Sequence, residues 1–188
     1  MLPDLSGFDL AKHGLSGLDL KPSHLWTDDE MDRFLDALRL ECADPVLGMR
    51  YTKKVAQALL DLSQCRRCGR CCDADPDHPE NNGVIVQEEE LKTIAKHTGI
   101  GYSVLIKNTY REKKPGNRSI RYLKQPCPFL SPQGCKIYRS RPTVCCSFPI
   151  TNVVDDGKTL VKISVRCDYG RDIYKTVLRM THDSAPPI

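Results

Sequence analysis

Residues 65–72 read CRRCGRCC, a stretch that holds four thiols and three arginines in eight positions. Cys65, Cys68 and Cys71 follow a C-x2-C-x2-C spacing, which lets one tight loop turn three sulfurs toward a single centre. Cys72 follows Cys71 directly, and in an extended segment neighbouring side chains point to opposite sides. We therefore expect this stretch to organise the fold around an inorganic centre, with Cys71 and Cys72 in different roles.

The remaining cysteines are dispersed along the chain. They stand at positions 42, 127, 135, 145, 146 and 167. Cys127 is followed by Pro128, and bacterial ferredoxins combine a C-x2-C-x2-C loop with a remote cysteine before proline around a [4Fe-4S] cube. This spacing favours Cys127 as a fourth ligand. Cys42 lies far from the others in sequence, and we expect it to be a small core residue.

Composition sets the compartment and the partners that we expect. The chain has ten cysteines, no segment typical of a secretory signal and no apolar run long enough for a membrane span. These features predict a cytoplasmic protein with reduced thiols, which makes disulfides the minor alternative. The net charge of +4 and the pI near 8.5 are too weak to indicate nucleic acid. From these totals we expect neither nucleic-acid nor membrane binding.

The arginines near the cysteines are predicted to balance charge. Four thiolates around Zn²⁺ or a [4Fe-4S] core leave a net charge of about −2, which is costly to bury unless cations or N–H donors face it. Arg66, Arg67 and Arg70 lie within the loop, and Arg141 lies near the later cysteines. We predict that these four side chains contact the cofactor. A solvated basic loop is the alternative.

The order of these motifs resembles a known family. CRRCGRCC is followed by CPFLSPQGCKIYRSRPTVCCSFP over 127–149 and by Cys167 before the last predicted helix. This pattern is similar to the YkgJ-like cysteine-cluster proteins, which have a CxxCxxCC pattern and are regarded as zinc- or iron-chelating. Cys42 and Cys146 fall outside the pattern. The resemblance implies the metal ligands Cys65, Cys68, Cys71, Cys72, Cys127, Cys135, Cys145 and Cys167.

The spacing leaves the identity of the cofactor open. Structural zinc sites are usually assembled from two separate C-x2-C knuckles. Here only residues 65–72 have that spacing, since Cys127, Cys135, Cys145 and Cys167 stand far apart. A cube offers several corners to one loop, so we favour a [4Fe-4S] iron–sulfur cluster, with zinc or mononuclear iron as the alternative. A related cysteine pattern in flagellin lysine methylases is also similar to an iron–sulfur site.

The cofactor in turn suggests the function. We predict electron transfer or an accessory role to a partner enzyme. A zinc-stabilised adaptor is the second hypothesis, and an enzyme that uses an open coordination position is the third. No catalytic triad, phosphate loop or dinucleotide motif accompanies the cysteines, so the sequence leaves open whether the protein is an enzyme.

The elements around the cysteines predict an α+β fold with short strands and several helices. The capping-box spacing of Thr27 and Glu30, followed by an apolar face, predicts a first helix. Asp44 and Pro45 predict the start of a second helix that runs to about Leu62. Residues 1–62 would thus form a helical-hairpin extension, which we predict to bind a protein partner, with additional core as the alternative.

The rest of the chain is predicted to be the metal-binding domain, residues 63–182, with a tail at 183–188. Apolar residues 84–86 and the alternating segment 117–124 predict strands. Asp156 and Gly157 predict a hairpin turn. Helices are predicted over 88–98, with Gly99 after its end, over 102–109 and over 168–180.

Overall fold

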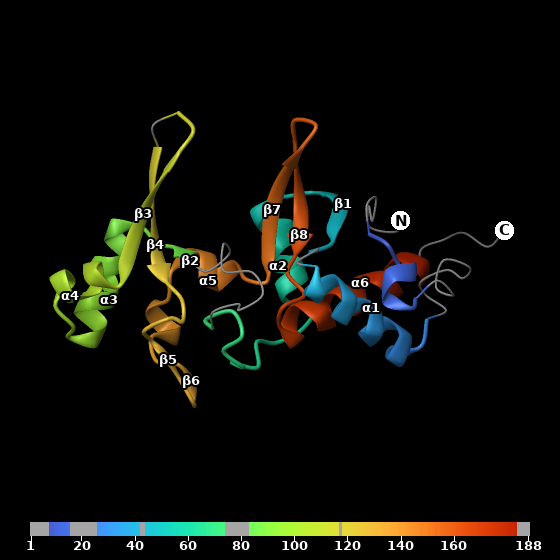
Figure 1. Ribbon diagram of the computed structural model, residues 1–188, viewed down its shortest axis with the longest axis horizontal. Helices are drawn as coiled ribbons and strands as arrows, with labels where there is room; N and C mark the ends of the chain where they lie inside the picture. Colours follow the sequence, from blue (N-terminus) through green and yellow to red (C-terminus); the bar gives the residue numbers. More distant parts are fainter. Residues whose placement is uncertain (1–7, 16–25, 42–43, 74–82, 117, 184–188) are drawn as a thin grey trace. The chain divides into compact units, whose positions relative to one another are not determined.

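The computed structural model describes residues 8–15, 26–41, 44–73, 83–116 and 118–183, and the chain packs as two compact units. The first unit contains residues 1–66 and 149–188, and the second contains residues 67–148. Each unit combines helices with short antiparallel strands, which confirms the α+β class (Figure 1). The units differ from the predicted segments 1–62 and 63–182, because the last hairpin and helix belong with the N-terminal elements. The predicted functional roles of those segments stay predictions.

In the first unit, helix α1 (Asp28–Leu40) forms where its capping signal predicts it. The Thr27 hydroxyl accepts a hydrogen bond from the Glu30 amide at 3.2 Å, and the Glu30 carboxylate accepts one from the Thr27 amide at 2.8 Å. The two bonds satisfy amide groups that a helix start leaves without partners. The predicted apolar face of the helix is buried and contains Met31, Phe34, Leu35 and Leu38.

The predicted second helix is wrong over its first half. Residues Val46–Arg50 form strand β1, and helix α2 (Lys53–Leu60) begins only after it. The predicted helical hairpin is therefore not confirmed. Asp44 does not cap a helix, since its carboxylate accepts a hydrogen bond from the amide of Val165 at 3.1 Å. This tertiary contact competes with the local helix signal.

Strand β1 exists because it pairs with a strand from the end of the chain. It runs antiparallel to β8 (Lys158–Ile163), which also pairs with β7 (Ile150–Asp155) in the sheet order β1-β8-β7. The β7–β8 hairpin turns at Asp156 and Gly157, which have φ angles of 43° and 69°. The predicted hairpin is thus confirmed.

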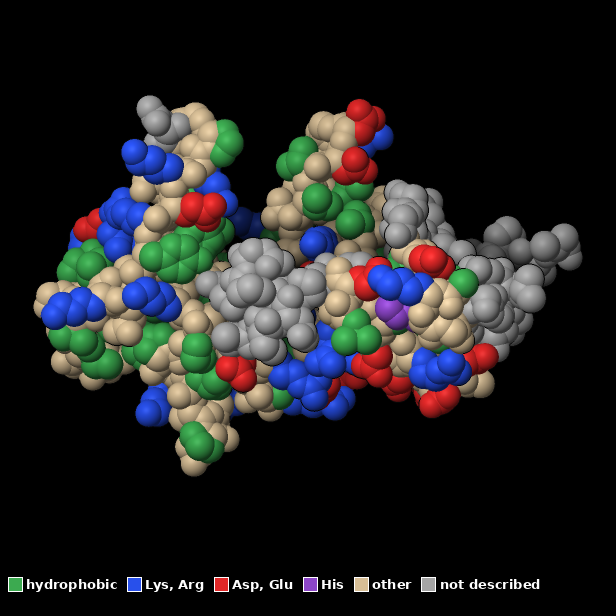
Figure 2. Space-filling view, viewed as in Figure 1, with side chains coloured by type: hydrophobic (Ala, Val, Ile, Leu, Met, Phe, Trp, Pro, Cys, Tyr) green, Lys and Arg blue, Asp and Glu red, His purple; other side chains and the backbone are tan. Residues whose placement is uncertain are grey.

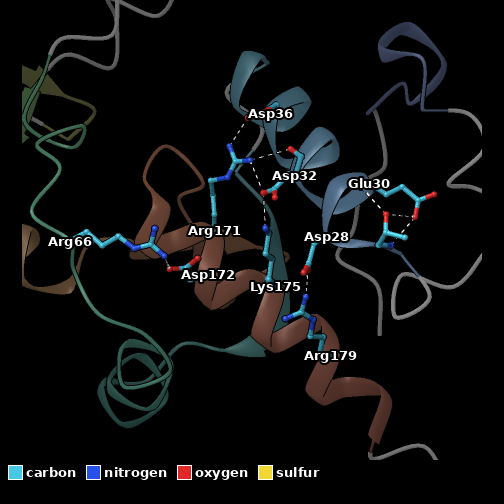
Figure 3. A network of polar contacts seen from close by, with 10 residues as sticks. Asp28, Glu30, Asp32, Asp36, Arg66, Arg171, Asp172, Lys175 and Arg179 are labelled. Atoms are coloured by element: carbon cyan, nitrogen blue, oxygen red, sulfur yellow. Dashed lines mark hydrogen bonds and ion pairs between the residues drawn. The ribbon is translucent and has the colours of Figure 1, made fainter.

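Helix α6 (Asp168–Asp183) packs along α1 in the first unit (Figures 1 and 3). Ile173 and Tyr174 of α6 are fully buried. Arg171 of α6 pairs with two aspartates of α1, with its nitrogens 3.1 Å from Asp32 Oδ1 and 2.5 Å from Asp36 Oδ1. Both apolar packing and ion pairs therefore hold the last helix against the first.

The second unit consists of a three-stranded sheet with two helices. The sheet order is β2-β4-β3, with bounds Gly83–Ile85, Arg118–Lys124 and Thr109–Lys114 in that order. Helices α3 (Glu88–Thr98) and α4 (Tyr102–Lys107) match the predictions, and Gly99 ends α3 with a φ of 71°. The core of this unit contains Val86, Leu91, Ile94, Leu105, Leu123, Phe129 and Ile137.

Short elements complete the second unit and carry the later cysteines. Strands β5 (Leu130–Ser131) and β6 (Gly134–Cys135) form a small hairpin. The 3-10 helix η5 (Tyr138–Ser140) and helix α5 (Thr143–Ser147) follow it. In the first unit, a 3-10 helix η1 (Ala11–His13) precedes α1. None of the helices in the described ranges has both the length and the apolar character that crossing a bilayer requires.

Candidate metal centre

Five cysteines of the second unit interact with one another through their thiols. None of the nine cysteines within the described residues forms a disulfide, while Cys42 lies outside the described residues. Within the second unit, five thiols that belong to the family pattern act on one another's pKa values, and we call them the five-thiol group; the exposed Cys146, whose charge also acts on Cys145, lies outside that pattern. Its members are Cys71, Cys72, Cys127, Cys135 and Cys145. They come from three separate segments of the sequence, so tertiary folding assembles the group.

A turn brings the first two thiols together. The Cys72 amide donates to the Gly69 carbonyl at 2.7 Å, and Gly69 has a left-handed φ of 79°. In this turn the sulfurs of Cys71 and Cys72 lie 3.8 Å apart. The prediction that these two side chains point to opposite sides is wrong, because it assumed an extended segment.

The third thiol is positioned on the loop by backbone hydrogen bonds. The Cys127 amide donates to the Cys72 carbonyl at 2.7 Å. Two residues earlier, the Gln125 side-chain amide donates to the Cys71 carbonyl at 2.8 Å. Gln125 is a positioning residue that the sequence reasoning missed, since a single glutamine carries no motif. These two bonds fix the segment before Pro128 against the cysteine loop.

Proton sharing among the thiols changes their acidity. The hydrogen bond between Cys72 and Cys127 raises the pKa of Cys72 and lowers the pKa of Cys127 to about 7. Burial, reinforced by the charges of Cys71, Cys127 and the other thiolates, raises the pKa of Cys145 to about 12. Burial also raises the pKa of Cys135. Without a cation, most of the group is thus protonated near neutral pH, since a thiolate there lacks a compensating charge.

Two of the predicted arginines stack on one aromatic ring in the same unit. The Cζ atoms of Arg67 and Arg141 lie 4.3 Å and 3.9 Å from the centroid of the Tyr138 ring. Arg141 Nε also donates to the sulfur of Cys146 at 3.4 Å. The sequence reasoning missed Tyr138, although its position between basic residues in KIYRSR was a usable signal for cation–π stacking.

Other predicted site residues lie elsewhere. Cys65 and Cys167 belong to the first unit, with Cys65 exposed and Cys167 buried, and Cys68 is an exposed residue of the second unit. Arg66 forms an ion pair with Asp172 of α6, at 2.6 Å (Figure 3). Arg70 is exposed. The roles of these residues toward a metal stay predictions.

The donor chemistry of the five-thiol group fits a thiophilic metal. Among the described residues, no three His, Cys, Asp or Glu side chains already stand in a ligand arrangement for one metal ion. The group nevertheless offers only sulfur donors, and its partly buried thiols would gain the missing counter-charge from a cation. Sulfur donors of this kind select zinc, iron or iron–sulfur centres.

Comparison with known proteins agrees with this chemistry. Neither the curated proteins nor the solved structures contain a match to the chain. Residues 64–168, more than half of the chain, match the family described as "CxxCxxCC: Putative zinc- or iron-chelating domain". The match begins one residue before the cysteine loop and ends just after Cys167. With its clustered thiols and this match, the chain belongs to the CxxCxxCC family and is a cysteine-rich metal-binding protein.

Proposed function

We propose that the five-thiol group holds a [4Fe-4S] iron–sulfur cluster and that the protein acts in electron transfer or as an accessory to a partner enzyme. The observations that support this proposal are the thiol contact of Cys71 with Cys72, the hydrogen bond from the Cys127 amide to the Cys72 carbonyl, and the influence of the thiols on one another's pKa values. A single tetrahedral ion and a four-iron cube both take four thiolates, so the number of thiols does not separate them. A cluster needs one thiolate for each of its four irons, and Cys71 ends the C-x2-C-x2-C loop that suits such a cluster.

The residues around the thiols would hold the cluster and limit its charge. When bound, the cluster would supply one-electron redox chemistry. Cys71, Cys127, Cys135 and Cys145 are the proposed ligands, with Cys65, Cys68 and Cys167 as further candidates from the family pattern. The turn at Gly69 and the Gln125 hydrogen bond orient Cys71. Arg67 and Arg141, held by Tyr138, would offset part of the negative charge.

A single metal ion is the second candidate, and one distance favours it. The sulfurs of Cys71 and Cys72 are separated by 3.8 Å. The edge of a tetrahedron of sulfurs around zinc, with Zn–S bonds of about 2.3 Å, is about 3.8 Å long. Both thiols would then bind the same zinc or iron ion. The protein would be a metal-stabilised adaptor, with residues 1–62 as the predicted contact for a protein partner.

Metal analysis separates the two candidates. The protein is purified under anaerobic conditions, and its absorption spectrum, iron, zinc and acid-labile sulfide are measured. A [4Fe-4S] centre predicts a brown protein with iron and sulfide in equal amounts of about four each per chain. A colourless protein with one zinc ion and no sulfide would reject the cluster and support the adaptor.

A further inference from the structure

Positive charge is concentrated on one β-ribbon of the second unit. We call residues 107–124 the basic ribbon; it contains β3, β4 and the residue at the end of α4. This segment has seven basic residues and one acidic residue, whereas the whole chain has 28 and 24. The basic residues are Lys107, Arg111, Lys113, Lys114, Arg118, Arg121 and Lys124. The whole-chain net charge of +4 conceals this local excess.

Little of this charge is neutralised within the unit. Among the described residues, the only carboxylate paired with a cation of the basic ribbon is Glu112, which lies 2.6 Å from Lys114 Nζ. Arg111 and Arg121 donate to hydroxyl groups, which leaves their charges uncompensated. The ribbon extends beyond helices α3 and α4, and Lys and Arg side chains gather over it (Figures 1 and 2).

The pairing of the strands works against the stability of the ribbon. Arg111 lies directly opposite Arg121, and Lys114 lies directly opposite Arg118. Like charges in these cross-strand positions destabilise a sheet. Protection of an edge strand from aggregation would explain lysines on β3 and Arg118, but Arg121 and Lys124 lie where β2 and Val86 cover the other side of β4. The charges of β4 therefore indicate an external anion.

An aromatic surface accompanies the charges on the same ribbon. Tyr110 and Tyr122 lie opposite each other with stacked rings, whose centroids are 5.2 Å apart. The ring of Tyr110 extends over Gly83 of β2, since a Cβ atom at Gly83 would lie 2.2 Å from the tyrosine hydroxyl. Tyr110 remains 37% exposed. Lys114 and Arg118 share this face of the sheet, because opposite residues point to the same side.

We propose that the basic ribbon binds single-stranded nucleic acid, with the cations on phosphates and the tyrosines against unpaired bases. Strands of six and seven residues span about 20 Å, which suits a linear polyanion better than one phosphate group. Cationic grooves with exposed aromatic rings are the general mode of binding to single strands. An acidic protein segment or an anionic membrane could also contact the tyrosines, but neither offers a row of flat bases for rings to stack on.

This activity goes beyond the proposed metal centre and does not depend on it. The ribbon contains none of the ten cysteines. A colourless zinc protein and a brown iron–sulfur protein would both present the same cations and tyrosines. The binding experiment and the metal analysis can therefore fail separately.

The test measures fluorescence anisotropy of labelled dT20 and U20 with the full chain, purified anaerobically with its metal. In the ribbon variant, Arg118→Glu and Lys124→Glu reverse two exposed charges on the face of the sheet that carries Tyr122. The matched control reverses two exposed lysines of α2, with Lys53→Glu and Lys54→Glu. We expect the ribbon variant to weaken binding about tenfold or more and the control to change it less than about twofold.

The salt dependence of binding tests the phosphate contacts, and a tyrosine substitution tests the stacking on bases. With about four phosphate contacts, the logarithm of the binding constant should fall with the logarithm of salt concentration with a slope near −3, and the ribbon variant should reduce that slope. Tyr110→Leu should weaken binding about fivefold or more through lost stacking. Arg118→Glu also replaces the repulsion from Lys114 by attraction, so an unchanged or higher melting temperature shows that lost binding does not come from unfolding.

Defined outcomes would overturn the proposal. These are no detectable binding to either oligonucleotide, or equal losses in the ribbon variant and the control. Equal competition by polyaspartate, or by vesicles with anionic lipid, would assign the ribbon to general polyanions. Tighter binding to a 20-base-pair duplex would reject the single-stranded form. Binding to U20 alone or to dT20 alone supports the proposal and identifies RNA or DNA as the ligand.

Discussion

The sulfurs of Cys71 and Cys72 lie 3.8 Å apart in a turn closed by the hydrogen bond from the Cys72 amide to Gly69. This contact makes the two thiols joint candidates for one ion. A cube would instead bind one of them, because its thiolates sit on separate irons and lie farther apart than two ligands of one ion. The single ion and the cube therefore predict different effects when one cysteine of the pair is replaced.

Serine replacements at this pair should separate the two arrangements. If one ion is bound, Cys71→Ser and Cys72→Ser should each abolish stoichiometric metal, since loss of one of four ligands opens the site. If a [4Fe-4S] cluster is bound through Cys71, then Cys72→Ser should retain iron and sulfide. The measurement is metal and sulfide content of folded protein, with Cys146→Ser as the exposed control. Full metal retention in both pair variants would remove Cys71 and Cys72 from the centre.

Metal affinity should fall as the pH is lowered. Thiolates, not thiols, bind metal, and the pKa values of Cys72, Cys135 and Cys145 are raised. Metal binding must therefore release protons around neutral pH. We expect the apparent binding constant to decrease about tenfold per pH unit for each proton released. Competition with a chelator of known pH dependence between pH 6 and 8 measures this slope, and a flat profile would contradict protonated ligands.

A tight approach between the β5–β6 turn and the cysteine loop should be sensitive to one methyl group. Gly134 has a φ of 93°, and a Cβ atom there would lie 3.0 Å from the backbone oxygen of Arg67. Gly134→Ala should displace the loop and lower the metal content. The control is Gly157→Ala, which also has a positive φ but has open space around it. It should cost only the backbone strain of about 1 kcal/mol. Equal metal contents in the two purified variants would show that the loop tolerates the displacement.

The ion pairs between α6 and α1 should differ in strength according to burial. Arg171 bridges Asp32 and Asp36 with a side chain that is 14% exposed. Arg179 pairs with Asp28 with a side chain that is 56% exposed (Figure 3). Arg171→Ala should lower the free energy of unfolding by about 1 kcal/mol, because it removes the hydrogen bonds of a mostly buried guanidinium to Asp36 and Asp32, while Lys175 still pairs with Asp32.

Arg179→Ala is the matched control for the buried pair. It should change the free energy of unfolding by less than about 0.5 kcal/mol, since water screens exposed pairs. Urea unfolding of both variants, with the metal content held equal, gives the comparison. A loss in Arg179→Ala as large as in Arg171→Ala would show that burial does not set the strength of these pairs.

The elements that the sequence predicted correctly have local causes. The capping box at Thr27, the glycine after α3 and the Asp156-Gly157 turn each act within a few residues. The incorrect helix over 46–50 shows the limit of local signals. The partner of Val46 is Lys162, which is more than a hundred residues away and carries no local mark.

The basic ribbon could have been predicted, because its excess of basic residues is present in the sequence. Averaging over the whole chain gave a weak net charge, whereas residues 107–124 contain seven basic residues and one acidic residue. The structure adds the register, which sets Arg111 against Arg121 and stacks Tyr110 on Tyr122. Only the register shows that the charges oppose folding.

The sequence by itself determined the chemistry of this protein. Eight of the ten cysteines follow the family pattern, which establishes the family and predicts sulfur ligands for its metal, because the type and order of donors are written in the chain. Only the tertiary structure decided which thiols meet. It joined Cys71 and Cys72 through a left-handed turn, and it placed Cys127 beside them through the hydrogen bond from its amide to the Cys72 carbonyl. Such contacts depend on backbone hydrogen bonds and core packing between remote residues, which spacing along the chain does not encode.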